Sequence, residues 1–197
     1  MERGRPALSS RLGLRSRSLI GGGPAAGRSC PVHRQGSTLG LINLGLRIDA
    51  KILPILEELA ELTGLESVYV TRINWSDHQQ EILAAANQEP TRLFIPEEVK
   101  LDYSDAVCRY VIEGGPPHTA DVPVVFPYSD MARFLGFQSF VSVPIEIGDG
   151  NVYGTLCGAS IRRVELSEPQ MVEVHRRARQ IGGMLSQTGD LSPRSKR

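Results

Sequence analysis

The cysteines are the residues of this chain whose type and spacing most directly suggest chemistry. There are three of them, Cys30, Cys108 and Cys157, and they are widely separated with no CxxC pair. An odd number at such spacing argues against a disulfide framework and a zinc site, and fits a reducing cytoplasm. A thiol becomes reactive in an electropositive or helix N-terminal setting, and no sequence neighbour of Cys157 supplies one. We therefore interpret Cys108 and Cys157 first as small buried side chains.

The remaining candidate groups are scattered along the chain. His118 follows two prolines at the start of a predicted edge strand, where an imidazole can meet a ligand or a haem iron. Trp75, in the turn-like segment NWSDH, either covers a pocket mouth or packs on a neighbouring loop. The motifs GxxxxGK[ST], GxSxG and HExxH are absent from the sequence. These residues predict no catalytic constellation and no metal site.

Length and composition predict one globular domain with tails. The chain has 197 residues, of which 41% are hydrophobic and 22% charged, close to the averages for soluble proteins. No apolar run reaches the ~18–20 uncharged residues that span a bilayer. Residues 1–49 hold eight Arg against Glu2 and Asp49, 8 − 2 = +6, so the neutral chain carries −6 elsewhere. We therefore expect a cytoplasmic protein with neither membrane nor nucleic acid as a partner.

The two ends of the chain differ from its middle. Residues 1–38 are rich in Arg, Gly, Ser and Pro without apolar periodicity, which predicts a disordered basic arm. A transit peptide, a nucleic-acid- or lipid-binding arm and a start codon assigned too far upstream share this composition. Residues 188–197 are predicted to be a flexible tail, which leaves a domain at 39–187. The sequence leaves open whether the chain is a fragment of a longer signalling protein.

Hydrophobic periodicity predicts long helices at both ends of this domain. The first has Asp49 as its N-cap, a kink or late start at Pro54 and a stop at Gly64. The last begins at Ser167. The apolar faces are expected to be Ile48, Ile52, Ile55, Leu56, Leu59 and Leu62 in the first helix, and Met171, Val174, Ala178, Ile181 and Leu185 in the last.

Alternating segments between these helices predict two hairpins. SVYVTRIN pairs with QQEILAAAN, and SFVSVPIEI pairs with NVYGTLCGASI. Short helices are expected at Ser104–Glu113 and within PYSDMARFLG, and a short strand at HTADVPV. In the last strand, a period of two places Cys157 on one face with Tyr153, Thr155 and Ala159. Hairpins alternating with helices predict an α+β fold with an antiparallel sheet.

Three segments together resemble the GAF domain family over about residues 48–185. They are LEELAELTGLESVYVTRIN, YSDAVCRYVIEGGPPHTADV and ARFLGFQSFVSVPIEIGDGNVYGTLCGAS. YSDAVC and YGTLCGAS are similar to bacterial GAF domains found N-terminal to diguanylate cyclases and sensor kinases. The resemblance implies a GAF/PAS-like fold. Its central antiparallel sheet of five to six strands carries the terminal helices on one face, and short helices and loops form a pocket on the other.

The resemblance also implies a non-catalytic sensory module. A small ligand, a nucleotide or another compound, occupies the pocket, and the terminal helices carry the signal to a partner or output domain and form a homodimer. The Cys-His dipeptide typical of bilin attachment and the Asn-Lys-Phe-Asp-Glu signature of cyclic-nucleotide binding are not found. Candidate pocket residues are Tyr103, Cys108, His118, Asp130, Thr155 and Cys157.

Two alternatives stay open. The first is a thiol-dependent reductase of a small sulfoxide, of the free methionine sulfoxide type, with Cys157 attacking and Cys108 resolving. The second is a domain with a vestigial pocket that serves only for dimerisation.

Overall fold

The computed structural model describes residues 38–148 and 150–188, with side chains from residue 50 to 187. Its helices are α1 (Thr38–Thr63), α2 (Cys108–Ile112), α3 (Val122–Val125), α4 (Asp130–Leu135) and α5 (Glu168–Thr188), with a 3₁₀ turn η1 (Tyr103–Asp105). Its strands are β1 (Ser67–Asn74), β2 (Gln79–Asn87), β3 (Lys100–Asp102), β4 (His118–Thr119), β5 (Ser139–Ile147) and β6 (Asn151–Ser160).

The strands form one six-stranded sheet in the order β3-β2-β1-β6-β5-β4. Every neighbouring pair is antiparallel. Both predicted hairpins, β1–β2 and β5–β6, are present, and β1 pairs with β6 at the centre of the sheet. The predicted α+β fold with an antiparallel sheet of five to six strands is confirmed.

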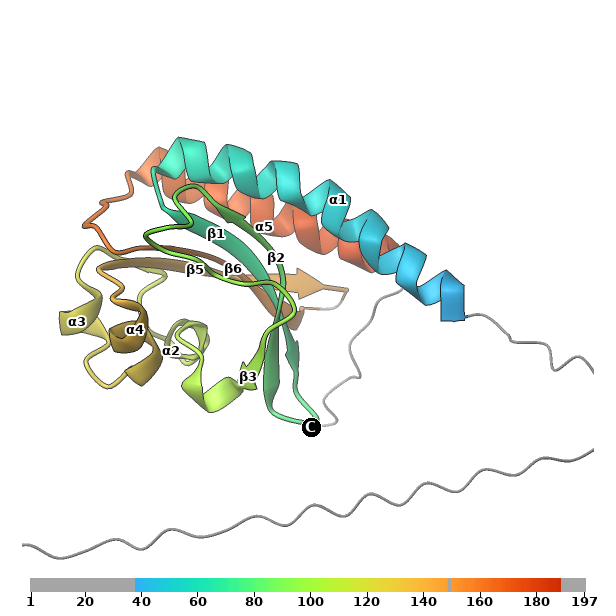
Figure 1. The fold of residues 1–197 in the computed structure, drawn as a ribbon, viewed down its shortest axis with the longest axis horizontal. Helices are drawn as coiled ribbons and strands as arrows, with labels where there is room; N and C mark the ends of the chain where they lie inside the picture. The colour runs from blue at the N-terminus through green and yellow to red at the C-terminus, as the bar shows by residue number, and fades with distance from the viewer. Residues whose placement is uncertain (1–37, 149, 189–197) are drawn as a thin grey trace, which may run out of the picture. The chain divides into compact units, whose positions relative to one another are not determined.

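Helices α1 and α5 lie side by side on one face of the sheet (Figure 1). Their apolar faces pack on side chains of β1, β2, β5 and β6 in a continuous core. An ion pair ties the two helices together, because Arg177 on α5 lies 2.5 Å from the Glu58 carboxylate on α1. Gln170 also donates to the Leu62 carbonyl at 2.8 Å.

Short helices α2, α3 and α4 cover the other face of the sheet (Figure 1). A second core lies beneath them, built around Phe126, Phe137 and Phe140 together with Cys108 and Cys157. The Phe137 and Phe140 rings stack with their centroids 6.1 Å apart, and Phe126 meets Phe140 edge-on. Aromatic side chains therefore fill the space under α3 and α4.

Helix ends follow the expected capping chemistry in α4 and α5. Ser129 accepts a hydrogen bond from the Ala132 amide at the start of α4, and Gly136 ends that helix at φ +71°. Ser167 precedes α5, and its amide donates to the side chain of Gln170 at 2.8 Å, as in a capping box. The predicted start of α5 at Ser167 and the predicted end of α4 at Gly136 are confirmed.

Two predictions about α1 are wrong, the N-cap at Asp49 and the apolar position at Leu62. Helix α1 begins at Thr38 and continues through Pro54, so Asp49 lies inside it and is no N-cap. Leucine-rich sequence before Asp49 favours helix, which explains the earlier start. Leu62 is 47% exposed, whereas Ala60 is buried, so the apolar face ends one turn earlier than predicted. The predicted core position Ile48 lies outside the described side chains.

The predicted helix Ser104–Glu113 is broken into η1 and α2. Ala106 between them is extended, with ψ 131°. Ala106, Val107 and Cys108 are all buried; successive helical residues point 100° apart, so the extended Ala106 helps this segment turn three residues in a row into the core. The segment HTADVPV likewise forms only the two-residue β4 before α3 begins at Val122.

Strand β6 departs from strict alternation at Tyr153. The register with β5 shifts there, since Gly154 pairs with Ile145 and Val152 with Glu146. This bulge turns Tyr153 toward α1 and α5, where it joins the first core, and leaves Thr155 and Cys157 facing the short helices. The prediction that Tyr153 shares a face with Cys157 is therefore wrong.

The predicted arm and tail lie outside the described residues, except for Thr38 and Thr188 at the ends of α1 and α5. Within the described part of the chain, no helix combines the length and hydropathy that a bilayer crossing needs.

Candidate functional site

A row of buried polar side chains crosses the middle of the sheet on the face under α2. Cys157 on β6 stands directly opposite Tyr69 on β1 and Ser142 on β5. Two residues along β6, Thr155 pairs with Thr71, and their hydroxyl oxygens lie 2.7 Å apart. All five side chains are buried, so the row is a polar strip within an otherwise apolar core.

The thiol of Cys108 reaches this row from α2. It donates to Gln80 Oε1 on β2 at 2.8 Å, and Cys108 and Cys157 lie in the same core. Cys157 Sγ in turn lies 3.1 Å from Thr155 Oγ1 and donates to Ser142 Oγ at 3.4 Å. Both cysteines are free thiols and no more than 2% exposed. The structure therefore brings together two thiols that are 49 residues apart in the sequence.

The two thiols differ in acidity. Burial raises the pKa of Cys157, but hydrogen bonds with Cys108, Ser142, Thr155 and Tyr69 outweigh burial and hold the pKa below its ordinary value. The hydrogen bond with Cys157, together with burial, raises the pKa of Cys108. Burial also raises the pKa of Tyr69 well above the ordinary value. Cys157 is thus the thiol better suited to lose its proton.

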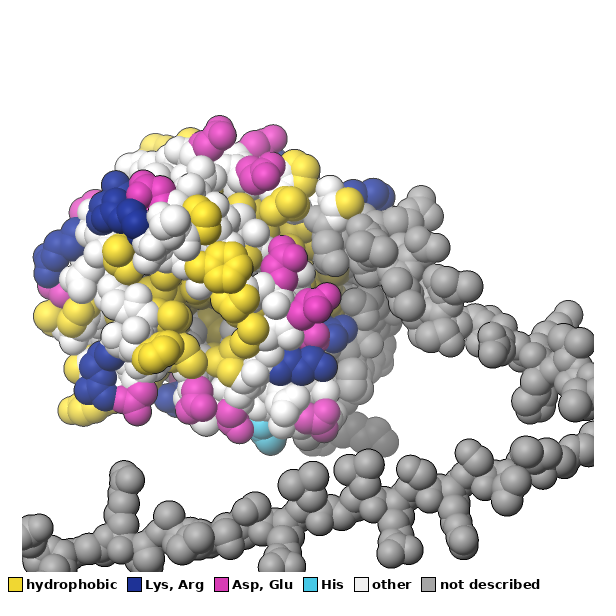
Figure 2. All heavy atoms as spheres, in the orientation of Figure 1, with side chains coloured by type: hydrophobic (Ala, Val, Ile, Leu, Met, Phe, Trp, Pro, Cys, Tyr) yellow, Lys and Arg dark blue, Asp and Glu magenta, His cyan; other side chains and the backbone are white. Residues whose placement is uncertain are grey.

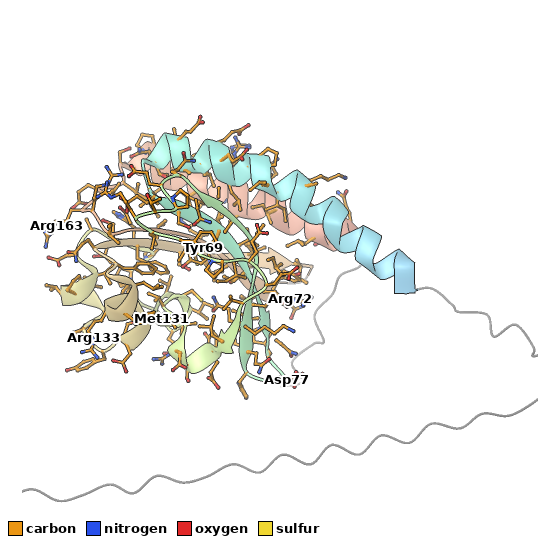
Figure 3. The ribbon with its side chains drawn as sticks, in the orientation of Figure 1. Tyr69, Arg72, Asp77, Met131, Arg133 and Arg163 are labelled. Atoms are coloured by element: carbon orange, nitrogen blue, oxygen red, sulfur yellow. The ribbon has the colours of Figure 1, made fainter. Side chains whose placement is uncertain are left out.

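A cleft opens at the surface between α2 and α4, outside the polar row. Its volume is about 390 Å³, within the range of small-molecule sites. One part of the lining is aromatic and apolar: Tyr110, Tyr128, Met131 and Phe134. The other is polar: Ser104, Asp105, Arg109, Ser129 and Asp130. In Figure 2, hydrophobic side chains gather around a hollow on this face, and Figure 3 marks Met131 and Arg133 on α4.

Two aromatic side chains of the cleft are unusually exposed. Tyr128 is 86% exposed and Phe134 is 84% exposed. Two of the three charged groups in the lining are paired: Arg109 pairs with Glu113 at 3.0 Å and lies over the Tyr110 ring, and Asp130 pairs with Arg133. The cleft therefore presents two exposed aromatic rings beside polar and charged side chains.

Tyr103 and Trp75 lie where β3 leads into α2. Their rings are 5.3 Å apart, and Trp75 Nε1 donates to the Val152 carbonyl at 2.9 Å. Among the described residues, the Tyr103 hydroxyl is the one buried side-chain oxygen or nitrogen without a hydrogen-bond partner. Burial and the nearby Cys108 and Glu113 raise the pKa of Tyr103 to about 12. Its hydroxyl thus stays a neutral group with unused hydrogen-bonding capacity.

The sequence-predicted site residues lie in separate parts of the structure. Cys108, Thr155 and Cys157 meet in the polar row, and Asp130 lines the cleft. Tyr103 lies beside Trp75 at the approach to α2. His118 lies on β4 at the sheet edge, where its Nε2 is 3.2 Å from the Val164 carbonyl. The structure does not bring His118 to the row or the cleft.

Sequence reasoning missed most of the cleft. Tyr128 precedes α4 and Phe134 lies within it, and their spacing of six residues gives no amphipathic signal on a helix this short. Gln80 and Tyr69 were not predicted as site residues, because the type of a strand residue does not indicate which side chains it contacts on neighbouring elements. Within residues 38–148 and 150–188, no group of His, Cys, Asp and Glu side chains is arranged to hold a metal ion.

The sequence model of the GAF domain family matches residues 47–182. This chain belongs to the GAF domain family. The family resemblance drawn from the sequence is thereby confirmed. The diguanylate cyclase DgcP of Escherichia coli (strain K12) is 31% identical to this GAF protein over 121 residues. That match takes in 61% of this chain but spans only 35% of the length of the curated relative.

Solved structures share the fold of this GAF domain. The phycoerythrobilin-bound GAF domain from a cyanobacterial phytochrome superposes with a TM-score of 0.59, at 15% identity, over 76% of this chain and 91% of that one. The type II free methionine-R-sulfoxide reductase from Thermoplasma acidophilum gives a TM-score of 0.58, also at 15% identity, over 74% of this chain and 96% of that one. At this identity the likeness concerns the fold alone.

Proposed function

We propose that this GAF domain is a non-catalytic sensory module that binds a small molecule in the cleft between α2 and α4. The observation that carries the proposal is the aromatic lining of the cleft, where Tyr128 and Phe134 are each more than 80% exposed. Exposed aromatic surface of this kind, around a concave site, is characteristic of ligand binding.

The lining indicates the chemical class of the ligand. Tyr128 and Phe134 offer ring faces for a flat, unsaturated molecule, and ring pairs of this kind contribute ~0.5–1.5 kcal/mol beyond area burial. Ser104 and Asp105 supply hydrogen-bond acceptors at the opposite wall. We therefore propose a planar ligand with hydrogen-bond donors on its rim. A nucleobase-containing compound is one member of this class.

The terminal helices are the proposed output. A ligand shifts a conformational equilibrium only by binding one state better than another, so its effect must reach an element that can rearrange. Helices α1 and α5 lie on the opposite face of the sheet from the cleft and are joined by the Glu58–Arg177 ion pair. The proposed signal passes through the sheet to this helix pair and on to a partner or output domain.

We further propose that the helix pair mediates homodimerisation. Leu62 at the end of α1 is 47% exposed and Val172 near the start of α5 is 59% exposed. The hydrogen bond from Gln170 to the Leu62 carbonyl places these two ends together. Two exposed apolar side chains at these neighbouring helix ends offer a surface for a second copy of the chain.

Native mass spectrometry of the full chain, purified directly from cells, tests the ligand proposal. We expect a bound small molecule, released on denaturation, and an absorbance spectrum of the same sample that identifies its chromophore class. The variant Phe134→Ala should lose this mass, whereas Val172→Ala, at another exposed apolar position, on α5, should retain it. A ligand-free mass for the unmodified chain would instead favour a domain that only dimerises.

The burial of Cys108 and Cys157 in one core favours a second candidate function, the thiol-dependent reduction of a small sulfoxide. The low pKa of Cys157 suits an attacking thiolate. Against this stands the burial of both thiols, since a substrate must reach the sulfur atom. Turnover of free methionine sulfoxide with dithiothreitol as the reductant, lost in Cys157→Ser, would establish this activity.

A further inference from the structure

We propose that the α2–α4 cleft selects a ligand with a positive charge, an organic cation of the amine or amidine class. This inference rests on the proposed ligand site and adds the charge of the ligand to it. Two features of the lining carry it: a carboxylate without a counter-ion at Asp105, and the two highly exposed rings of Tyr128 and Phe134. Carboxylates and aromatic rings are the groups with which proteins bind organic cations.

Asp105 is the unpaired charge of the cleft. It is the last residue of η1, and it is exposed. Within the described part of the chain, its carboxylate forms no ion pair and no hydrogen bond. Asp102, by contrast, accepts a hydrogen bond from the Ser104 amide at 2.8 Å and so caps the same turn. The carboxylate of Asp105 therefore has no structural role in η1 and is available to a ligand.

The other charges of the cleft are balanced within the protein. Counting the ion-pair partners of the lining, the charged residues are Asp105, Glu113, Asp130, Arg109 and Arg133. Three negative charges against two positive ones leave one net negative charge. In Figure 2, acidic side chains follow one another below the hydrophobic side chains of this face. The local charge therefore attracts a cation and opposes an anion such as a phosphate group.

One ring of the cleft already holds a cation of the protein itself. The guanidinium carbon of Arg109 lies 4.6 Å from the centroid of the Tyr110 ring, which is a cation–π contact. Phe126 also stacks on Tyr110, with the ring centroids 5.3 Å apart. The rings that remain for a ligand are therefore those of Tyr128 and Phe134, which are 86% and 84% exposed.

These features together narrow the class of ligand. A protonated amine or an amidinium group donates charge-assisted N–H bonds to the Asp105 carboxylate, and its positive charge is attracted by the face of an aromatic ring. A phosphate group would meet the same carboxylate with like charge. Among planar ligands with hydrogen-bond donors on the rim, the cleft is therefore expected to prefer cationic compounds over compounds that carry a phosphate.

Three probes of nearly the same shape isolate the effect of charge. Benzamidinium, benzamide and benzoate are planar aromatic compounds that are positive, neutral and negative at neutral pH. Each is titrated into the isotope-labelled full chain, and the amide chemical shifts report both the place of binding and the Kd. We expect benzamidinium to shift the cleft resonances with a Kd about 5–10-fold lower than that of benzamide, and benzoate to bind most weakly. Added salt should weaken the binding of benzamidinium but not of benzamide.

Asp105→Asn removes the charge and keeps the shape of the side chain. It should raise the Kd for benzamidinium by about 5–10-fold, to that of benzamide, and leave the Kd for benzamide unchanged. The control Glu57→Gln removes one negative charge from an exposed position on α1, on the other face of the sheet, and should leave all three Kd values unchanged. Phe134→Leu keeps an apolar side chain without a ring and should weaken the binding of benzamidinium.

Several outcomes would overturn the cation preference. Equal binding of benzamidinium and benzamide in the cleft, or no effect of Asp105→Asn, would do so and leave the cleft as a ligand site. Tighter binding of benzoate would do so by assigning the selectivity to Arg109 or Arg133. If no probe shifts the cleft resonances, the preference is also overturned, and the bound mass lost in Phe134→Ala decides separately whether the cleft holds a ligand.

Discussion

The hydroxyl groups of Thr71 on β1 and Thr155 on β6 lie 2.7 Å apart at the buried centre of the sheet. Thr71 Oγ1 also accepts a hydrogen bond from the Thr155 amide at 3.1 Å, and Thr155 Oγ1 lies 3.1 Å from Cys157 Sγ. The pair thus joins the two central strands and connects them to the thiols under α2.

A double-mutant cycle on this pair should reveal strong coupling. Thr71→Val removes the acceptor of the buried Thr155 amide, so we expect it to lower the free energy of unfolding by ~1–3 kcal/mol. Thr155→Val alone should cost a similar amount, and the double variant should cost less than the sum of the two. Urea unfolding of the four proteins measures the coupling, and strictly additive losses would contradict the structural assignment.

Neighbouring glycines of α5 should respond to alanine in opposite ways. A Cβ on Gly182 would lie 2.4 Å from the Glu146 carbonyl on β5, whereas a Cβ on Gly183 meets nothing within 4 Å. Gly182→Ala should destabilise the fold by ~1–3 kcal/mol because α5 must move off the sheet. Gly183→Ala should raise stability by up to ~1 kcal/mol through helix propensity.

Thermal or urea unfolding of the two glycine variants provides this comparison directly. Equal effects on both would mean that α5 does not approach β5 as closely as the structure has it.

The buried carboxylate of Glu66 should make stability depend on acid pH. Burial raises its pKa, but hydrogen bonds from the Ile161 amide, Ser160 and Arg162 outweigh burial and hold the pKa below its ordinary value. A pKa lower in the folded than in the unfolded chain stabilises the fold at pH values above ~4.5, the ordinary glutamate range. That stabilisation is lost as the pH falls through the folded-state pKa.

Glu66→Gln should therefore unfold more readily at pH 7, by about 1–3 kcal/mol, and the difference from the unmodified chain should shrink below pH ~4.5. The matched control is Glu57→Gln, at an exposed position on α1, which should change the free energy of unfolding little. A difference that persists unchanged into strong acid would show that the carboxylate charge is not responsible.

Substitutions on the helix pair test the proposed dimer. Leu62→Glu and Val172→Glu introduce charge on the exposed apolar edge of α1 and α5 and should weaken self-association by at least about 10-fold in Kd. Val124→Glu on α3 changes an equally apolar, 71% exposed position away from the helix pair and should leave it intact. Sedimentation equilibrium supplies the measurement, and a chain that stays monomeric at all concentrations would refute the dimer.

Much of the fold follows from local sequence patterns. The two hairpins, the start of α5 at Ser167 and the end of α4 at Gly136 were predictable because period-two alternation, caps and glycine stops are local signals. The bulge at Tyr153 and the break at Ala106 were not, because each arises from packing against a distant strand or core. Local patterns hold no information about such contacts.

The candidate site was predictable only in part. Cys108 and Cys157 stood out by residue type, but their burial in one core depends on how α2 packs on the sheet, which the sequence does not encode locally. The aromatic side chains of the cleft were missed because Tyr128 and Phe134 follow no periodic pattern. His118 was chosen for its chemistry, yet its ring is engaged by the Val164 carbonyl at the sheet edge.

The most direct test of the sensory proposal is the melting temperature of the chain with the small-molecule ultrafiltrate of the cells that produce it. We expect the ultrafiltrate to raise the melting temperature of the unmodified chain and of Val172→Ala, because binding to the folded state alone stabilises it. Phe134→Ala, which removes an exposed ring of the cleft, should fold normally and show no shift. An equal shift in Phe134→Ala would place the ligand elsewhere, and no shift in any protein would contradict the account.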